Sequence, residues 1–242
     1  MQEMFETLKS QFILNFINDD RWRFLVSGLG VTLRITFFAL LIGIMIGIVV
    51  AIVRSTHDKN IDKIRNGWGR FLLKFVNFIC KIYLTVIRGT PVVVQLMIFY
   101  FVILVSIRNG ELIGIIAFGI NAGAYIAEIF RSGIMSIDNG QFEAGRSLGF
   151  NYIQTMWYII IPQGFRNILP TLANEFIVLL KETAVVGYVA VQDLTKAGDI
   201  IRGRTFSAFM PLIAVALLYL TLVMFFTWLV GKLERRLRSS ER

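Results

Sequence analysis

The sequence predicts an all-α integral membrane protein with five transmembrane helices. Of its 242 residues, 56% are hydrophobic and 17% are charged, whereas a soluble domain carries about 25% charged residues. Long apolar runs alternate with short charged segments, as a hydrocarbon core about 30 Å thick requires. The runs fall at about 25–53, 75–105, 112–137, 165–190 and 206–230. With their loops they use nearly the whole chain, so we expect no separate soluble domain.

The composition also excludes several classes of function. The net charge of +9 does not indicate a nucleic-acid partner, because the basic residues gather at helix ends instead of forming a patch on a soluble fold. Cys80 is the only cysteine and His57 the only histidine. An intrachain disulfide is therefore impossible, and the sequence offers no clustered ligands for a metal site and no catalytic constellation.

Residues 1–23 form a segment distinct from the spans. Its large apolar residues recur at helical spacing, which predicts an amphipathic helix; they are Phe5, Leu8, Phe12, Ile13 and Phe16. Such a helix either lies in the outer membrane interface or packs against the helix bundle.

The distribution of lysine and arginine predicts the orientation. An odd number of spans places the loop after the first span and the segment after the fifth span, which includes the C-terminal tail 233–242, on one side, and both are basic. They carry Arg54, Lys59, Lys63, Arg65, Arg70, Lys74, Lys232, Arg235, Arg236, Arg238 and Arg242. Acidic residues outnumber basic ones in the N-terminal segment. We therefore expect the N-terminus outside, residues 24–232 as the membrane domain, and the basic tail in the cytoplasm.

The cytoplasmic segment 138–162 carries signals for two short helices. Asp138 can cap the first, with Gln141 reaching back as in a capping box, and Gly149 suits the left-handed residue that ends it. Asn151, with Gln154 three residues on, has the same pattern for the second helix.

Two further features of this segment bear on its function. Pro162 is expected to close the second helix. Ala144 and Gly145 would leave part of the first helix bare, so that the backbone of another protein could approach. An ordinary reversal between two spans needs neither two capped helices nor so many residues.

This segment resembles the EAA motif of ABC importer permeases. The residues that match are Glu143-Ala144-Gly145, Gly149 and Ile159-Ile160-Ile161-Pro162, at the spacing of that motif throughout. The chain departs from the pattern at Gly145, which replaces alanine, and at Ile161, which replaces leucine. Both replacements are small or apolar.

Two other stretches resemble the polar-amino-acid branch of these permeases. One is Arg88-Gly89-Thr90-Pro91 followed by Gln95, and the other combines Asn174-Glu175-Phe176 with Leu180-Lys181-Glu182-Thr183. The resemblance covers about residues 24–232 and implies the type I importer fold. It also implies a chain that is not itself an enzyme: a multi-pass permease subunit in the bacterial plasma (inner) membrane.

The resemblance further implies a set of partners. A coupling helix would dock into a cytoplasmic ATPase dimer, and ATP and Mg would be bound there, with no cofactor on this chain. The coupling residues implied are Gln141, Phe142, Glu143, Ala144, Gly145, Arg146, Ser147, Leu148 and Gly149. A second permease subunit (the same chain or a similar one), an extracytoplasmic amino-acid-binding protein and membrane lipid complete the set.

Polar residues inside the spans are candidates for the transport path, because ionisable groups there are costly and commonly functional. The candidates are Arg88, Thr90, Gln95, Asn121, Tyr125, Glu128, Asn174, Glu175, Lys181 and Glu182. Each charged group also has a structural reading. Arg88 either binds a carboxylate or pairs with another helix, Glu128 can pair locally with Arg131, and Lys181 with Glu182 can belong to an interhelical ion-pair network.

Two rival functions can be weighed against the sequence. A secondary transporter or channel working alone usually has more spans and often inverted repeats, and no repeat is evident here. The stretch 198–205 imitates a phosphate-binding P-loop, but it lies in a predicted outer loop with no βαβ unit around it. We therefore expect a separate chain to hydrolyse ATP.

Overall fold

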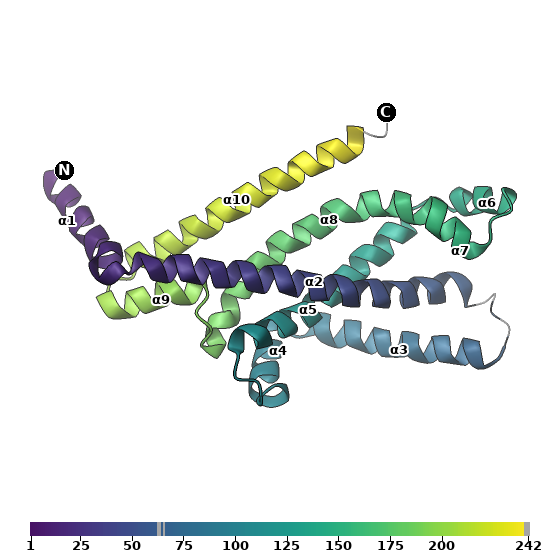
Figure 1. The fold of residues 1–242 in the computed structure, drawn as a ribbon, viewed down its shortest axis with the longest axis horizontal. Helices are drawn as coiled ribbons and strands as arrows, with labels where there is room; N and C mark the ends of the chain where they lie inside the picture. The colour runs from purple at the N-terminus through teal and green to yellow at the C-terminus, as the bar shows by residue number, and fades with distance from the viewer. Residues whose placement is uncertain (62–63, 65, 240–242) are drawn as a thin grey trace. The chain divides into compact units, whose positions relative to one another are not determined.

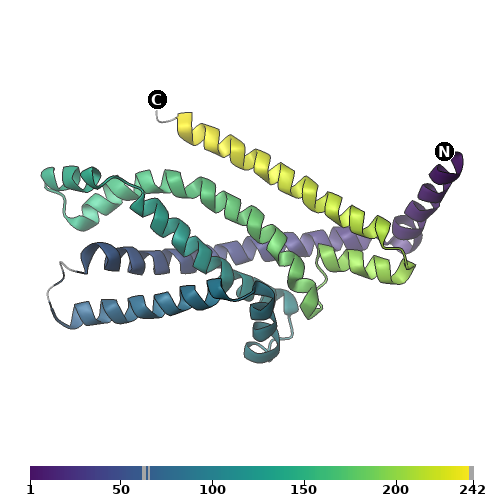
Figure 2. The ribbon, with the colours of Figure 1, turned by 180° about the vertical axis from the view of Figure 1, so that it is seen from behind.

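The computed structural model describes residues 1–61, 64 and 66–239, and every regular element within them is helical (Figures 1 and 2). The α-helices are α1 (Gln2–Phe12), α2 (Trp22–Asn60), α3 (Trp68–Gly89), α4 (Val92–Ile98), α5 (Gly110–Met135), α6 (Asn139–Ser147), α7 (Tyr152–Thr155), α8 (Ile161–Glu182), α9 (Leu194–Thr205) and α10 (Phe209–Ser239). Three π-helical segments, Ile13–Ile17, Phe99–Ile103 and Met156–Ile160, and two 3₁₀ segments, Asn18–Asp20 and Thr183–Val189, extend or join them. Three of the predicted topogenic residues, Lys63, Arg65 and Arg242, lie outside the described residues.

Three helices in the described part of the chain are long and apolar enough to cross a membrane: α2, α5 and α10. A fourth span results if α3 and α4 with the π segment that follows are counted as one broken span. Helix α8 carries Arg166, Glu175, Lys181 and Glu182 and does not qualify by composition. The count of five spans and their orientation therefore stay predictions.

The second predicted span, 75–105, is not one continuous helix. Helix α3 ends at Gly89, Thr90 is extended, and α4 starts at Val92. Pro91 accounts for the break, because it lacks a backbone N–H and disfavours helical geometry in the residue before it. The hydropathy of this run did not indicate the break.

The fourth predicted span, 165–190, also differs. The helical path extends without interruption from α7 through Met156–Ile160 into α8, so Pro162 does not close the second cytoplasmic helix. A π turn, in which the Ile161 N–H bonds the Met156 carbonyl, precedes the proline and accommodates its missing donor. At the other end α8 stops at Glu182 and a 3₁₀ segment follows.

One of two compact units comprises Met1–Ala39, Val92–Phe118 and Ile177–Trp228. Its core joins α2, α9 and α10 through buried Leu25, Leu194, Ile201 and Val215. The P-loop-like stretch 198–205 lies within helix α9 and is helical throughout. Helix α1 exposes its large apolar residues Phe5, Leu8 and Phe12, whereas Phe16 of the following π segment packs into this core.

The other unit comprises Leu40–Pro91, Gly119–Phe176 and Leu229–Arg242. Val50 of α2, Cys80 of α3 and Ala127 of α5 form one buried cluster of its core. Gly47 lies so close to α5 that an added Cβ would stand 2.6 Å from the Ile126 Cγ2, and Gly43 is similarly tight. These small residues let α2 and α5 approach closely.

Candidate functional site

Helix α6 begins at the predicted cap but with a different partner. The Asp138 carboxylate accepts a hydrogen bond of 2.7 Å from the Gly140 N–H, and Gln141 does not reach back. The capping box expected at Asp138 was wrong, because the Gln141 side chain instead accepts a 3.2 Å bond from Gln163 of α8. Gly149 has φ +81°, which confirms the left-handed residue that ends this helix.

The second cap of the cytoplasmic segment is as predicted. The Asn151 side chain accepts a bond from the Gln154 N–H, and the Gln154 side chain accepts one from the Asn151 N–H, both at 2.9 Å. This reciprocal capping box fixes the start of α7 directly after α6.

Helix α6 is held against the rest of its unit by three contacts. The Lys59 ammonium, at the end of α2, stands 3.8 Å from the ring centroid of Phe142, and Phe142 packs against buried Ile134, Ile137 and Ile160. The ring of Phe142 also stacks on Tyr152 of α7. Helix α6 is thus held in contact with α2, α5 and α7.

The expectation that Gly145 leaves a bare surface was wrong. Gly145 is buried, and a Cβ added to it would stand 2.7 Å from the Thr155 Cγ2 of α7. Its small size therefore serves the packing of α6 on α7 inside the chain.

The outward face of the α6–α7 region is partly apolar. Leu148, Ile153, Trp157 and Tyr158 are each more than 60% exposed. The other coupling candidates on α6 that face outward are Gln141, Glu143, Ala144, Arg146 and Ser147. Large apolar side chains gathered on an exposed surface mark a contact site for another protein or for lipid.

A second feature is a cavity of about 640 Å³, here called the basic cavity. Its lining comes from α2, α3 and α5, namely Arg54, Lys81, Leu84, Thr85, Arg88, Gly89, Tyr125, Glu128 and Arg131. Four of these side chains are cations and one is a carboxylate. Arg131 lies four residues before the end of α5, and α6 follows that end in the chain.

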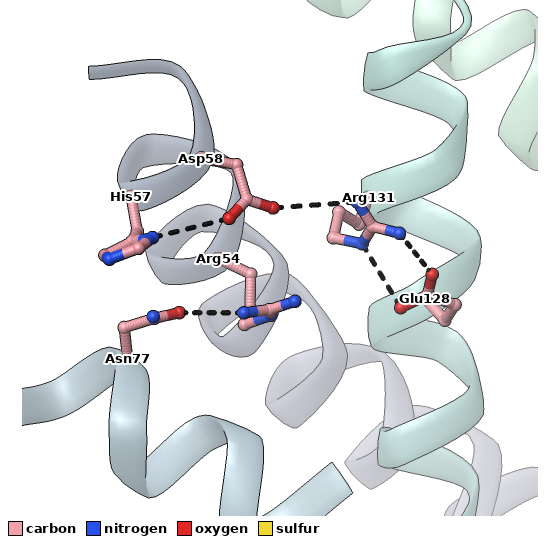
Figure 3. Close-up of polar contacts among 6 residues, drawn as sticks. All are labelled: Arg54, His57, Asp58, Asn77, Glu128 and Arg131. Carbon is pink, nitrogen blue, oxygen red and sulfur yellow. Dashed lines mark hydrogen bonds and ion pairs between the residues drawn. The ribbon is translucent and has the colours of Figure 1, made fainter. Parts of the chain in front are cut away.

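One cation of the basic cavity is fully compensated (Figure 3). The Arg131 guanidinium bonds the Glu128 carboxylate, with a Nε–Oε2 distance of 3.2 Å, and lies 3.6 Å from the Asp58 carboxylate of α2. The local pair foreseen as one role for Glu128 is therefore present. Asp58 extends it into a link between α2 and α5.

The three remaining cations have no carboxylate partner among the residues that the structure describes. Arg54 donates a 3.1 Å bond to the Asn77 amide oxygen (Figure 3). The Arg88 guanidinium lies 5.8 Å from the Tyr125 ring centroid, a cation–π distance, and Lys81 is exposed. These groups give the cavity an excess of positive charge.

Comparison with known proteins now identifies the chain. Residues 67–239 match the family model for the inner membrane component of binding-protein-dependent transport systems. The chain belongs to this family. A putative glutamine transport system permease protein of Rickettsia typhi is 36% identical over 217 residues, covering 88% of this chain and 93% of the relative. The arginine transport system permease protein of Bacillus subtilis is 34% identical over 221 residues, covering 90% and 94%.

Solved structures agree. A chain of an amino acid ABC transporter crystallised with histidines superimposes with a TM-score of 0.77 at 38% identity, covering 88% of this chain and 94% of that one. An inward-facing methionine ABC transporter has the same fold, with a TM-score of 0.75 at 21% identity over 91% of this chain and 99% of that one. The resemblance to ABC importer permeases seen in the motifs is thereby confirmed.

The remaining transport-path candidates of this permease do not line the basic cavity. Asn121 and Gln95 are buried, Thr90 donates to the Val86 carbonyl, and Asn174 and Glu175 lie on α8. Lys181 and Glu182 end α8, and neither forms an ion pair with a residue that the structure describes.

Three predicted residues, Arg88, Tyr125 and Glu128, do meet at the basic cavity. Sequence reasoning missed Arg54, Lys81 and Arg131 as lining residues. The seven-residue spacing of Lys81 and Arg88 was the available signal, because it places both on one face of α3.

Proposed function

We propose that this chain is a permease subunit of an ATP-driven importer, which moves a polar or charged amino acid into the bacterial cytoplasm by alternating access. It would act in the plasma (inner) membrane with five spans, the N-terminus outside and the C-terminus inside. The names of its relatives support this class of substrate, since they are permeases for glutamine and arginine.

The attachment of α6 carries the coupling part of the proposal. A capped helix held by Lys59 and Thr155 can pass on a rigid-body movement, which a flexible loop cannot do. The exposed apolar side chains around it, Leu148 and Trp157 among them, suit a protein partner. We infer that a separate ATPase dimer, which binds ATP and Mg, docks here and that its closure rocks the permease.

Two further partners belong to the proposal. A second permease subunit, identical or similar, would give one coupling helix per ATPase subunit, and an extracytoplasmic binding protein would deliver the amino acid. Helix α10 supports an assembly in lipid, because only 11% of its most apolar stretch is buried within this chain.

The test is reconstitution of the permease with its ATPase and binding protein in proteoliposomes. Glu143→Lys and Gly149→Arg should abolish ATP hydrolysis stimulated by the loaded binding protein, while the permease still folds. Glu6→Lys on α1 is the matched control, because it makes the same charge change at another exposed site. Unchanged transport in the two α6-region variants would contradict coupling through this helix, and accumulation of substrate without the ATPase would favour a secondary transporter.

A second pair of variants separates docking from folding. Ala144→Leu adds bulk to an exposed position, so it should weaken ATPase binding and leave the thermal stability of the permease unchanged. Gly145→Leu adds the same bulk against Thr155 and should lower stability by about 2 kcal/mol. Equal ATPase affinity for Ala144→Leu and the unmodified permease, measured in detergent, would count against docking at this face.

A further inference from the structure

The basic cavity holds more positive charge than its neighbours compensate. Arg54, Lys81 and Arg88 line it together, and none of them has an ion pair in the part of the chain that the structure describes. The Arg54 Nε is buried and has no hydrogen-bond partner among those residues. Cations near the membrane interior are costly unless an anion or a water-filled path accompanies them.

The carboxylates nearby are already engaged. Glu128 bonds Arg131 through both oxygens, and Asp58 lies between Arg131 and His57 (Figure 3). If Glu128 or Asp58 turned to pair with Arg54, Lys81 or Arg88, Arg131 would lose a carboxylate partner. Lys81 and Arg88 are exposed on this chain, so their positive charge can attract an anion from outside it.

The shape and lining of the cavity suit a small ligand. Its volume of about 640 Å³ falls in the usual range for small-molecule sites, which is roughly 300–1,000 Å³. Gly89 contributes no side chain, and the Thr85 hydroxyl and the Tyr125 ring stand beside the cations. Guanidinium groups such as those of Arg54 and Arg88 can bind a carboxylate through two parallel hydrogen bonds.

We propose that the basic cavity is an anion-selective part of the transport path, which binds amino acids with a carboxylate side chain and excludes arginine and lysine. An acidic amino acid brings two carboxylates and one ammonium, so its net negative charge offsets part of the excess. A cationic amino acid brings a further positive charge into a site that already repels it. This inference rests on the proposed function and specifies the charge of its substrate.

The test is a binding measurement on the whole permease–ATPase complex in nanodiscs, without the binding protein, by calorimetry. L-glutamate should bind and L-arginine should not. Lys81→Gln and Arg88→Gln should each raise the Kd for glutamate by about tenfold, the loss of one charge-assisted contact. Lys74→Gln is the matched control, since Lys74 lies seven residues before Lys81 on α3 but does not line the cavity.

Several results would overturn the inference. These are arginine affinity equal to that for glutamate, no binding of glutamate, or equal effects of Arg88→Gln and Lys74→Gln. Phosphatidylglycerol that co-purifies with the complex and is lost in both cavity variants would assign the cations to lipid. Loss of the permease dimer in Arg88→Gln would assign them to a subunit interface.

The same complex separates this inference from the proposed function. With the binding protein present, ATP-driven uptake of arginine and none of glutamate would keep the importer and refute the anion-selective cavity. No ATP-driven uptake of any amino acid would refute the importer itself.

Discussion

Helices α2 and α5 carry charged side chains in both units of the molecule, but the two sets are arranged differently. In the first unit the Arg34 guanidinium forms two parallel bonds, of 2.8 and 3.1 Å, to the Glu111 carboxylate. In the second unit Arg131 is held by Glu128 and Asp58, while Arg54 and other cations of the basic cavity lack a carboxylate among the described residues. Charges that join two helices come with their partners. Cations around a cavity that have no carboxylate partner among the described residues instead indicate a binding site for another molecule.

Among the variants that test this contrast, Arg131→Glu should have the largest effect on the stability of the permease. It would replace the cation between Asp58 and Glu128 by a third carboxylate, and like charges at that spacing repel. Because the three side chains are partly shielded from solvent, we expect a loss of about 3 kcal/mol in unfolding free energy.

Thermal unfolding of the solubilised permease measures this effect, with Arg131→Lys as the conservative control. Retained stability in Arg131→Glu would mean that the Asp58–Arg131–Glu128 link does not hold α2 to α5.

A double-mutant cycle on the first unit sharpens the comparison. Arg34→Met and Glu111→Gln should each destabilise the permease, and the double variant should lose less than the sum. The coupling should be about 1 kcal/mol, because Arg34 is half-exposed and solvent screens the pair. The same cycle on Arg88 and Glu128 should give a smaller coupling, since both line the basic cavity but no ion pair joins them. Equal couplings would remove the distinction between the paired and the uncompensated sets.

The features that could be predicted from the sequence are those set by neighbouring residues. The Asn151–Gln154 box and the left-handed Gly149 depend on a few adjacent positions and came out as expected. The close approach at Gly47 also has a local signal, because Gly43 and Gly47 stand four residues apart on one helix face.

The features that could not be predicted depend on distant contacts. Gly145 was assigned to the surface because Thr155, which covers it, comes to it only when α6 folds back on α7. The role of Arg54 in the cavity depends on α3 and α5 lying beside α2, which its position in a basic loop conceals. Hydropathy averaged over a span likewise hides the effect of one residue, such as Pro91.

The smallest expected effect on stability concerns the ion pairs of helix α9, which lies outside the predicted spans. Hydrogen bonds from Arg202 and Lys196 hold the pKa of Asp199 below its ordinary value of 3.8. A depressed folded-state pKa means that this carboxylate stabilises the fold at neutral pH and loses that contribution as the pH falls through the folded value. Asp199 is largely solvated, so its contribution to stability should be smaller than that of the Arg34–Glu111 pair.

As the pH is lowered from about 5 to about 3, the thermal unfolding midpoint should therefore fall less steeply in Asp199→Asn than in the unmodified permease. Glu6→Gln, at an exposed position of α1, removes one carboxylate that is not in an ion pair with a described residue and serves as the control. A slope in Asp199→Asn equal to that of the unmodified protein would mean that the α9 ion pairs do not persist in solution. Exposed pairs of this kind would then contribute nothing measurable, and the paired side of the comparison would rest on Arg34 and Arg131 alone.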